Sequence, residues 1–365
     1  MFGKIWIQFK IHVIILVLLL SHEAIFAASS GCIGADSLEH KIDTYLVPLV
    51  NANKFSGSIL IAKGNVILFS KGYGYANREH DIPNSPNSVF RIGSMTKQFT
   101  ATAIMQLIEK DKLRLEDKLN QFIDDYPQGE KITIHHLLTH TSGIPNFTRF
   151  DNYTKLMTIP VSITELIERF KYKPIEFKPG SQFKYTDSGY ILLTYIIEKI
   201  SGLSYAEYLE ENILRPLNMM NTGYDHNELI LKNRANGYVK SKNNEMLNAP
   251  YIDMSIPMGA GGLYSTTIDL YKWDLGLYTD IILSSKYRQK MFTPYMADYG
   301  YGWGFETRKG GRKSIGHNGV INGFSSIIHR FIEDKVVIII LANIESNTAN
   351  QVFNEIPSIY FKEND

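Results

Sequence analysis

The sequence of 365 residues contains a single cysteine, Cys32. An intramolecular disulfide is therefore excluded, and the folded state must be stabilised by the packing of its core. Hydrophobic residues make up 44% of the chain and aromatic residues 12%. A chain of this length and composition can bury a large core, which predicts one big domain or two interlocked ones.

The chain also lacks an excess of charge of either sign. It has 38 lysines and arginines against 37 aspartates and glutamates, which gives a formal net charge of +1. No run of five or six like charges occurs along the chain. This balance argues against nucleic acid or an anionic surface as a partner.

Near the N-terminus the apolar run is too short to span a bilayer, which takes about 20 residues. The segment Ile11–Leu20 is apolar except for His12, and Lys4 and Lys10 precede it. The segment Ala24-Ile25-Phe26-Ala27 then offers a cleavage site with small residues at its two ends. Residues 1–27 are therefore predicted to be a secretory signal peptide, and the mature protein is expected to be exported to the periplasm, the cell envelope or the medium.

Membrane association would need either an uncleaved signal or a lipid attached to Cys32. The sequence around the cysteine supports lipidation poorly, because Ser29 stands where a lipoprotein signal normally has a leucine-like residue. An unmodified thiol is the simpler interpretation of Cys32.

Both ends of the chain contain strand-like runs next to a helical segment. After a helical pattern at 37–50, residues 58–62 and 66–69 form a predicted hairpin, and the runs at 323–330 and 335–341 form another, followed by a helix at 347–361. Further helices are expected at 94–110, 134–138, 162–170, 189–200 and 205–214. No internal repeat or low-complexity linker appears.

These patterns predict an α/β fold of the α+β type, in which an antiparallel sheet is flanked by helices and built from both chain ends. A mostly helical part is inserted between the two contributions to the sheet. We expect one domain over residues 35–365, with the sheet part at about 35–92 and 255–365 and the helical part at about 93–254.

The segment Ser94-Met95-Thr96-Lys97 opens one of the predicted helices. Residues three apart share a face of a helix, so Ser94 and Lys97 can point into one cavity. A hydroxyl becomes an effective nucleophile beside a base, and burial would lower the pKa of Lys97 toward neutrality. The pattern alone is weak, because a second copy occurs at Ser181–Lys184 and because Ser94 could simply be the N-cap of its helix.

Two further motifs follow Ser94 in the chain: Tyr185-Thr186-Asp187 and His317-Asn318-Gly319. With them, most of residues 35–345 resembles the class C β-lactamase and low-molecular-weight penicillin-binding protein family. That family combines Ser-x-x-Lys, Tyr-x-Asn and Lys- or His-x-Gly. Other segments similar to the family are His136–Pro145, Phe177–Gly180, Leu214–Met219 and Gly259–Thr266.

The resemblance implies a serine acyl-hydrolase that acts through an acyl-enzyme on Ser94. Tyr185, held near two cations, would move the proton from Ser94 to the leaving group and later activate water. His317 would take the electropositive place of the third motif. The backbone N–H groups of Ser94 and Val320 would form the oxyanion hole, and Gly319 would leave room for the substrate.

The tyrosine is chosen by its sequence context, because Tyr75, Tyr251 and Tyr278 also begin Tyr-x-Asn or Tyr-x-Asp patterns. Tyr185 is preferred because Phe177–Gly180 precedes it, as the family places these segments.

The chain departs from the family at two of the expected site residues. Asp187 stands where asparagine is common, and its carboxylate would favour the charged form of Lys97. His317 replaces the lysine usual in β-lactamases, which makes efficient β-lactam hydrolysis a less expected activity.

A D-alanyl peptide of the cell wall is therefore the first substrate expected, followed by an ester or another D-amino-acid amide. A hypothesis of a different class is a non-catalytic or stalled sensor that binds peptidoglycan or a β-lactam.

The sequence implies neither a metal nor an organic cofactor. His136 and His140 are four residues apart, but no glutamate base or third ligand accompanies them, which argues against a zinc site. No serine lies in a Gly-x-Ser-x-Gly pattern, which argues against the nucleophile-elbow hydrolases.

Overall fold

The computed structural model describes residues 37–308 and 311–361. The predicted signal peptide at 1–27 and Cys32 lie outside this part of the chain. The chain divides into two compact units, one ending at Val47 and the other beginning at Pro48. Helix α2 (Leu38–Asn51) confirms the first predicted helix and crosses this division. Within the described residues, no helix combines the length and apolar character needed to cross a membrane.

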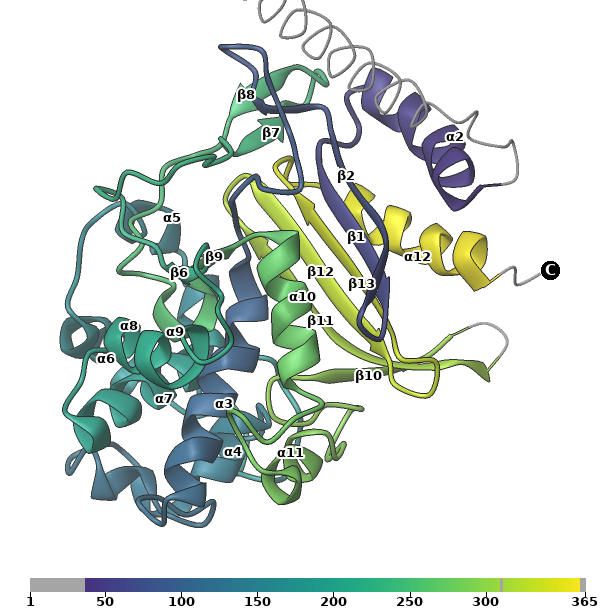
Figure 1. Cartoon of the computed structure of the whole chain (residues 1–365). Helices are drawn as coiled ribbons and strands as arrows, with labels where there is room; N and C mark the ends of the chain where they lie inside the picture. The colour runs from purple at the N-terminus through teal and green to yellow at the C-terminus, as the bar shows by residue number, and fades with distance from the viewer. Residues whose placement is uncertain (1–36, 309–310, 362–365) are drawn as a thin grey trace, which may run out of the picture. The chain divides into compact units, whose positions relative to one another are not determined.

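A six-stranded antiparallel sheet forms the centre of the second unit (Figure 1). Its order is β10-β11-β12-β13-β1-β2. Strand β1 pairs with β13 from Gly57 opposite Ala342 to Lys63 opposite Val336. Both chain ends therefore contribute to one antiparallel sheet, as predicted. The strands are β1 (Gly57–Lys63), β2 (Val66–Tyr73), β10 (Gly304–Thr307), β11 (Lys313–Ile321), β12 (Phe324–Phe331) and β13 (Val336–Ala342).

Helices cover both faces of this sheet. Helix α12 (Thr348–Phe361) packs on β12 and β13, and α10 (Thr267–Gly276) packs on β13 and β1 (Figure 1). Every residue of β12 and β13 is buried. A strand covered on both faces needs no polar alternation, which explains the continuous apolar run in β13.

The segment between the two contributions to the sheet is largely helical. Its longest helices are α3 and α7, and α3 is buried along its whole length except for its last residue. The helices are α3 (Thr96–Glu109), α4 (Ile134–Leu138), α5 (Tyr153–Leu156), α6 (Ile163–Lys171), α7 (Asp187–Ser201) and α8 (Tyr205–Leu209), with α9 (Met258–Gly261) and α11 (Ser285–Met291) further on.

Short strands and single turns complete the described chain. Three small sheets pair β3 with β4, β9 with both β5 and β6, and β7 with β8. These strands are β3 (Tyr75–Asn77), β4 (Ile82–Pro83), β5 (Phe90–Arg91), β6 (Gly223–Tyr224), β7 (Tyr238–Lys240), β8 (Met246–Asn248) and β9 (Leu263–Ser265). The turns are η1 (Gly93–Met95), η2 (Leu119–Gln121), η3 (Gly129–Lys131), η4 (Phe147–Arg149) and the π-helical η5 (Glu210–Leu214).

Two predicted helices differ from the structure in how they begin or end. The helix expected at 94–110 consists of the 3₁₀ turn η1 followed by α3, so Ser94 lies in the turn before the α-helix. The helix expected at 205–214 is α8 followed by the π-helical turn η5. The turn η1 packs against β11 and β12, which places Ser94 beside the central sheet.

Candidate active site

Ser94 is presented by the tight turn η1. The preceding Gly93 has a φ of 50°, a conformation that residues with a side chain rarely adopt. The interpretation of Ser94 as a helix N-cap is wrong, because the N-cap of η1 is Ile92 and that of α3 is Met95. The Ser94 side chain is left available for the cavities beside it.

Lys97 lies in the first turn of α3 and is fully buried. Its Nζ donates to Ser94 Oγ at 3.2 Å, to Asp187 Oδ1 at 2.7 Å and to the carbonyl oxygen of Ala260 at 2.8 Å. Burial lowers the pKa of Lys97, whereas the charge and hydrogen bond of Asp187 act in the opposite direction. The three acceptors match the three hydrogens of an ammonium group, so the resting state has Lys97 charged and paired.

Asp187 begins helix α7, and its carboxylate accepts hydrogen bonds from other residues besides Lys97. Its Oδ2 accepts hydrogen bonds from Asn146 Nδ2 at 3.1 Å and from Thr148 Oγ1 at 3.3 Å. Burial alone would raise the pKa of Asp187, but Lys97 and these hydrogen bonds lower it below its usual value. Asp187 is therefore a carboxylate with a fixed orientation.

The ring of Tyr185 lies over the lysine, with Lys97 Nζ 4.8 Å from the ring centroid. The Tyr185 hydroxyl oxygen is buried and makes no hydrogen bond to the described part of the chain. Burial, together with the charge of Asp187, raises the pKa of Tyr185 well above 10, although the neighbouring Ser94 acts in the opposite direction. Tyr185 therefore keeps its proton in the resting state. The ring of His140 lies against it at a centroid distance of 4.2 Å.

His317 on β11 faces Tyr185, with the two ring centroids 6.2 Å apart. Its Nδ1 donates to its neighbouring carbonyl, that of Asn318, at 2.6 Å, and its Nε2 accepts from the Tyr299 hydroxyl at 3.0 Å. Burial and the nearby Lys97 lower the pKa of His317 to about 4. The expected positive charge on His317, and with it the second cation near Tyr185, is therefore wrong at neutral pH.

The predicted oxyanion donors belong to two backbone segments in close contact. A Cβ atom on Gly93 would lie 2.9 Å from the nitrogen of Val320, and one on Gly319 would lie 3.0 Å from the nitrogen of Ser94. The same Cβ on Gly319 would lie only 2.1 Å from the carbonyl oxygen of Ile92. Gly319 is thus required by the approach of the turn to the strand. That it also leaves room for a substrate stays a prediction.

Ser94 lines two cavities, which also share Val320. The first has a volume of about 200 Å³, and its lining includes Asp187, Glu345, Phe147 and Tyr153. The second has a volume of about 460 Å³, and its lining includes Tyr185, Tyr299, His317, Asp298 and Glu306. Beyond Gly316 the outer edge of β11 has no partner strand among the described residues, so the second cavity runs along a free strand edge.

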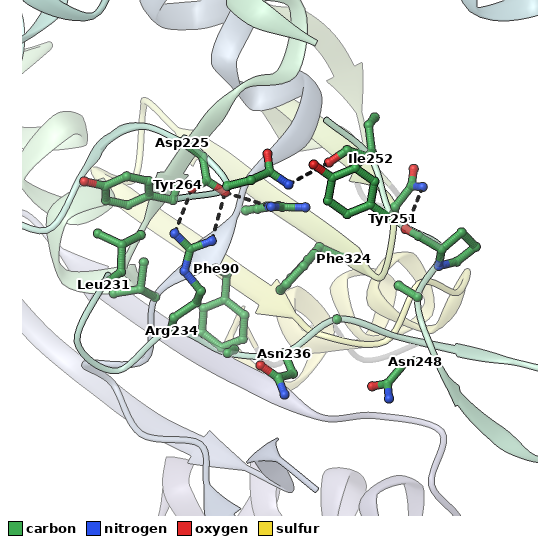
Figure 2. Close-up of a pocket in the computed structure, with 18 residues that line it drawn as sticks. Phe90, Asp225, Leu231, Arg234, Asn236, Asn248, Tyr251, Ile252, Tyr264 and Phe324 are labelled. Atoms are coloured by element: carbon green, nitrogen blue, oxygen red, sulfur yellow. Dashed lines mark hydrogen bonds and ion pairs between the residues drawn. The ribbon is translucent and has the colours of Figure 1, made fainter. Parts of the chain in front are cut away.

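A third cavity, of about 270 Å³, lies next to the first and shares Ile252 and Asn322 with it. Figure 2 shows the Arg234 guanidinium facing the Asp225 carboxylate in this cavity. Arg91 Nε also donates to Asp225, at 2.7 Å, and the Asp225 side chain is fully buried. These ion pairs link strand β5 to the segment that follows β6.

The second Ser-x-x-Lys copy and the other tyrosine motifs do not take part in this site. Ser181 Oγ donates to the Lys178 carbonyl and Lys184 pairs with Glu176, so the second Ser-x-x-Lys copy does not form a pair. The side chains of Tyr75, Tyr251 and Tyr278 are 41%, 53% and 41% exposed. The Nδ1 atoms of His136 and His140 accept hydrogen bonds from the backbone N–H groups of Thr133 and Thr186, respectively.

The site also contains residues that carried no prediction. His140 packs on Tyr185, Tyr299 binds His317, and Asn146 holds Asp187. His140 lies within the segment His136–Pro145, which was noted only as similar to the family, and Asn146 directly follows that segment. Tyr299 lies in the aromatic and glycine-rich stretch 299–303, the one local signal that could have drawn attention to it.

The chain is similar in sequence and in fold to several known proteins. The family model described as Beta-lactamase matches residues 42–355. The chain is 35% identical over 319 residues to PbpX of Bacillus subtilis (strain 168), assigned by its name to the penicillin-binding proteins, with 87% of this chain and 77% of that protein covered. It is 27% identical over 328 residues to a teichoic acid D-alanine hydrolase of Staphylococcus aureus, with the same coverages.

Among solved structures, the crystal structure of a penicillin-binding protein from Bacillus halodurans has a TM-score of 0.77 at 30% identity. The match covers 86% of this chain and 99% of that protein.

Proposed function

The chain belongs to the beta-lactamase family and is a serine hydrolase of the type that includes the penicillin-binding proteins, and from this premise we propose that it hydrolyses D-alanyl substrates of the cell wall through an acyl-enzyme on Ser94. The observation that carries the proposal is the 3.2 Å contact between Ser94 Oγ and the Nζ of a fully buried lysine, Lys97. The name of the Staphylococcus aureus relative, a teichoic acid D-alanine hydrolase, supports a D-alanyl group as the acyl group.

Lys97 and Tyr185 would divide the proton transfers between them. Burial lowers the pKa of Lys97, so its neutral form becomes populated as the pH rises, and neutral Nζ accepts the Ser94 proton as Oγ attacks the carbonyl carbon. Tyr185, whose raised pKa keeps it protonated, donates to the leaving group. The N–H groups of Ser94 and Val320 would stabilise the oxyanion, each contributing about 3 kcal/mol. Water then releases the acyl group by the reverse transfers.

The first test is time-resolved labelling with a fluorescent penicillin, followed by intact mass. We expect a single adduct that is lost in Ser94→Ala but retained in Ser181→Ala, the serine of the second Ser-x-x-Lys copy. A persistent adduct together with hydrolysis of D-alanyl substrates supports a penicillin-binding hydrolase, and rapid decay supports a β-lactamase. Labelling without hydrolysis of any substrate would indicate a stalled sensor.

A fourth outcome is the absence of an adduct despite turnover of a nitrophenyl ester, which would indicate an esterase or aminopeptidase closed to β-lactams. Hydrolysis that persisted in Ser94→Ala would contradict the assignment of the nucleophile.

Export is part of the same proposal, because the expected substrates lie outside the cytoplasm. It is supported by the secretory pattern of residues 1–27, and fractionation of cells that produce the full chain would test it. Recovery of the protein in the cytoplasm with residues 1–27 still attached would contradict export.

A further inference from the structure

We propose that the 270 Å³ cavity binds an anionic group of the substrate, a carboxylate or a phosphate, through the surplus positive charge of Arg91 and Arg234. The anion ends a substrate arm that leaves the 200 Å³ cavity beside Ser94 and passes Ile252 and Asn322, which line both cavities. This inference rests on the proposed function and adds to it a preference for charge at a distance from the reacting carbonyl group.

The charged side chains that line this cavity do not balance. They are Arg91, Arg234 and Asp225, so two permanent positive charges meet one carboxylate. Asp225 is fully buried and accepts hydrogen bonds from Arg91 Nε at 2.7 Å and from Arg234 Nη2 at 2.9 Å. Because one arginine is enough to neutralise Asp225, the second leaves a net positive charge. A cleft whose charge has one sign attracts ions of the opposite sign.

Arg91 also has donors that the cluster does not use. Its Nε binds Asp225, but its two terminal nitrogens donate to no residue in the described part of the chain. In Arg234 both terminal nitrogens bind Asp225, and one of them also donates to the Leu229 carbonyl at 3.0 Å. The side chains of Arg91 and Arg234 are only 16% and 27% exposed, which limits screening of their charges. A guanidinium with two such nitrogens can bind a carboxylate or a phosphate.

The other walls of the cavity suit the arm that carries the anion. Figure 2 shows the rings of Phe90, Phe324 and Tyr251 around the pair of Asp225 and Arg234. Aromatic rings offer a large apolar surface on which an uncharged arm can pack. A volume of about 270 Å³ accommodates an anionic group together with part of its arm.

The two cavities that Ser94 lines cannot bind the anion equally well. No lysine or arginine of the described residues lines either of them. Glu345 lines the smaller cavity and Asp298 the larger, so an anion in either would approach an acidic side chain. Like charges brought together weaken binding. An anionic arm is therefore expected to place its charge in the adjoining cavity, between the arginines.

Another cavity, of about 520 Å³, is also basic and is the main competitor. Arg149, Arg169 and Lys173 line it, and it shares Phe147 and Tyr153 with the smaller cavity beside Ser94. Arg149 and Lys173 are exposed, however, so water and salt screen their charges more than those of the partly buried arginines in the 270 Å³ cavity. The experiment below distinguishes the two cavities.

The test measures Ser94-dependent hydrolysis of D-alanine nitrophenyl esters whose amine carries an adipoyl, suberoyl or sebacoyl arm. Each arm ends in a free carboxylate, in a phosphonate of matched length or in a neutral methyl ester. At the best length, we expect kcat/KM for the better anion to exceed that for the methyl ester about tenfold, mainly through KM, as for a hydrogen bond to a charged group. The ratio between carboxylate and phosphonate shows which anion the cavity prefers.

Leu231→Glu adds a carboxylate to the lining of the 270 Å³ cavity without removing a partner of Asp225 (Figure 2). We expect this variant to lose the preference for an anionic arm and Leu231→Gln, its neutral match, to keep it. Arg91→Gln, which leaves Asp225 paired with Arg234, should also lose the preference. Lys173→Gln removes a positive charge from the competing cavity and should keep it. Thermal melts would establish that all four variants fold.

Equal kcat/KM for the anionic and neutral arms at every length would overturn the inference. A preference that survived both Leu231→Glu and Arg91→Gln, or that was lost in Lys173→Gln, would overturn it as well. These results leave the proposed function intact, because N-acetyl-D-alanine nitrophenyl ester has no arm and reports the reaction at Ser94. If neither that ester nor nitrophenyl acetate were hydrolysed in a Ser94-dependent way, the proposed function would fail and this inference with it.

Discussion

At the scale of single residues, the chemistry of the site depends on how Asp187 holds Lys97. Burial lowers the pKa of Lys97 and Asp187 raises it, so the balance sets the pH at which a neutral lysine becomes available. An ammonium bound to three acceptors cannot accept the Ser94 proton until it loses one of its own. The acid side of the pH–rate profile should therefore report the ionisation of Lys97.

Asp187→Asn removes the negative charge that opposes burial, so the pKa of Lys97 should fall further. We expect the acid limb of kcat/KM for nitrophenyl acetate to move to lower pH by about one unit, which corresponds to about 1.4 kcal/mol. Nitrophenyl acetate is used because it carries no ammonium that could respond to Asp187 directly. Asp253→Asn, in one of the other Tyr-x-Asp patterns, serves as the control. An acid limb that stayed in place in Asp187→Asn would show that Lys97 is not the ionising group.

Sequence reasoning found the residues of this site that are linked by short spacing or by a motif. Ser94 and Lys97 are three apart, and Tyr185 and Asp187 lie two apart at the start of a helix. Tyr299 was missed because its relation to His317 depends on the course of the chain between β10 and α11, which no local pattern encodes. The charge of His317 was predicted wrongly because burial, which decides it, is a property of the folded chain.

At the scale of elements, the contact between the turn η1 and strand β11 fixes the oxyanion donors. Gly93 and Gly319 let the two backbones approach, and a side chain on either would displace one segment from the other. The positions of the Ser94 and Val320 nitrogens thus depend on a backbone contact as much as on the catalytic side chains.

Gly319→Ala should separate η1 from β11, because its Cβ would lie 2.1 Å from the Ile92 carbonyl oxygen. We expect kcat for nitrophenyl acetate to fall about a hundredfold, as on loss of one oxyanion donor. Gly304→Ala on the neighbouring strand is the matched comparison, since its Cβ would meet its nearest neighbour at 3.6 Å. Circular dichroism melts would establish that both variants fold. Equal activity of the two variants would show that the close contact between η1 and β11 does not determine the positions of the oxyanion donors.

Hairpins and amphipathic helices were predictable because their patterns are local. Strands β1, β2, β12 and β13 follow the predicted runs closely. Strand β10 was not predicted, since its four residues follow a glycine-rich stretch and are stabilised mainly by pairing with β11. The 3₁₀ turn at Ser94 could not be predicted from the sequence pattern either, because it depends on the left-handed backbone conformation of Gly93 and on packing against β11.

At the scale of the whole molecule, the sheet unites the two ends of the chain, and this was predictable from the mirrored order of elements. The order of the six strands was not, because pairing of β1 with β13 is a long-range choice that residue patterns do not specify. The domain bounds proposed from the sequence remain a prediction. The same sheet carries two buried histidines, His317 on β11 and His329 on β12, and these couple its folding to pH.

Burial lowers the pKa of His317 to about 4 and that of His329 to about 3, with the nearby Lys97 and Arg308, respectively, acting in the same direction. The ordinary pKa in the unfolded chain is about 6.5. Each histidine therefore contributes its full stabilisation above pH 6.5 and loses it as the pH falls from 6.5 toward its folded pKa. Between pH 6 and 5 most carboxylates remain ionised, so the histidines dominate the pH dependence in this interval.

We expect the free energy of unfolding, measured by urea titration, to fall between pH 6 and 5, with His317 and His329 each contributing about 1.4 kcal/mol per pH unit. His135, His136 and His140, whose pKa values burial also lowers, add to the same slope. In His329→Gln the slope should be shallower by the contribution of one group, whatever the stability of the variant at pH 7. His226→Gln, which replaces an exposed histidine outside the central sheet, is the control and should keep the wild-type slope. If the slope were the same in all three proteins, His329 would have to be charged or exposed in the folded state, and the packing of α12 against this face of the sheet would be in error.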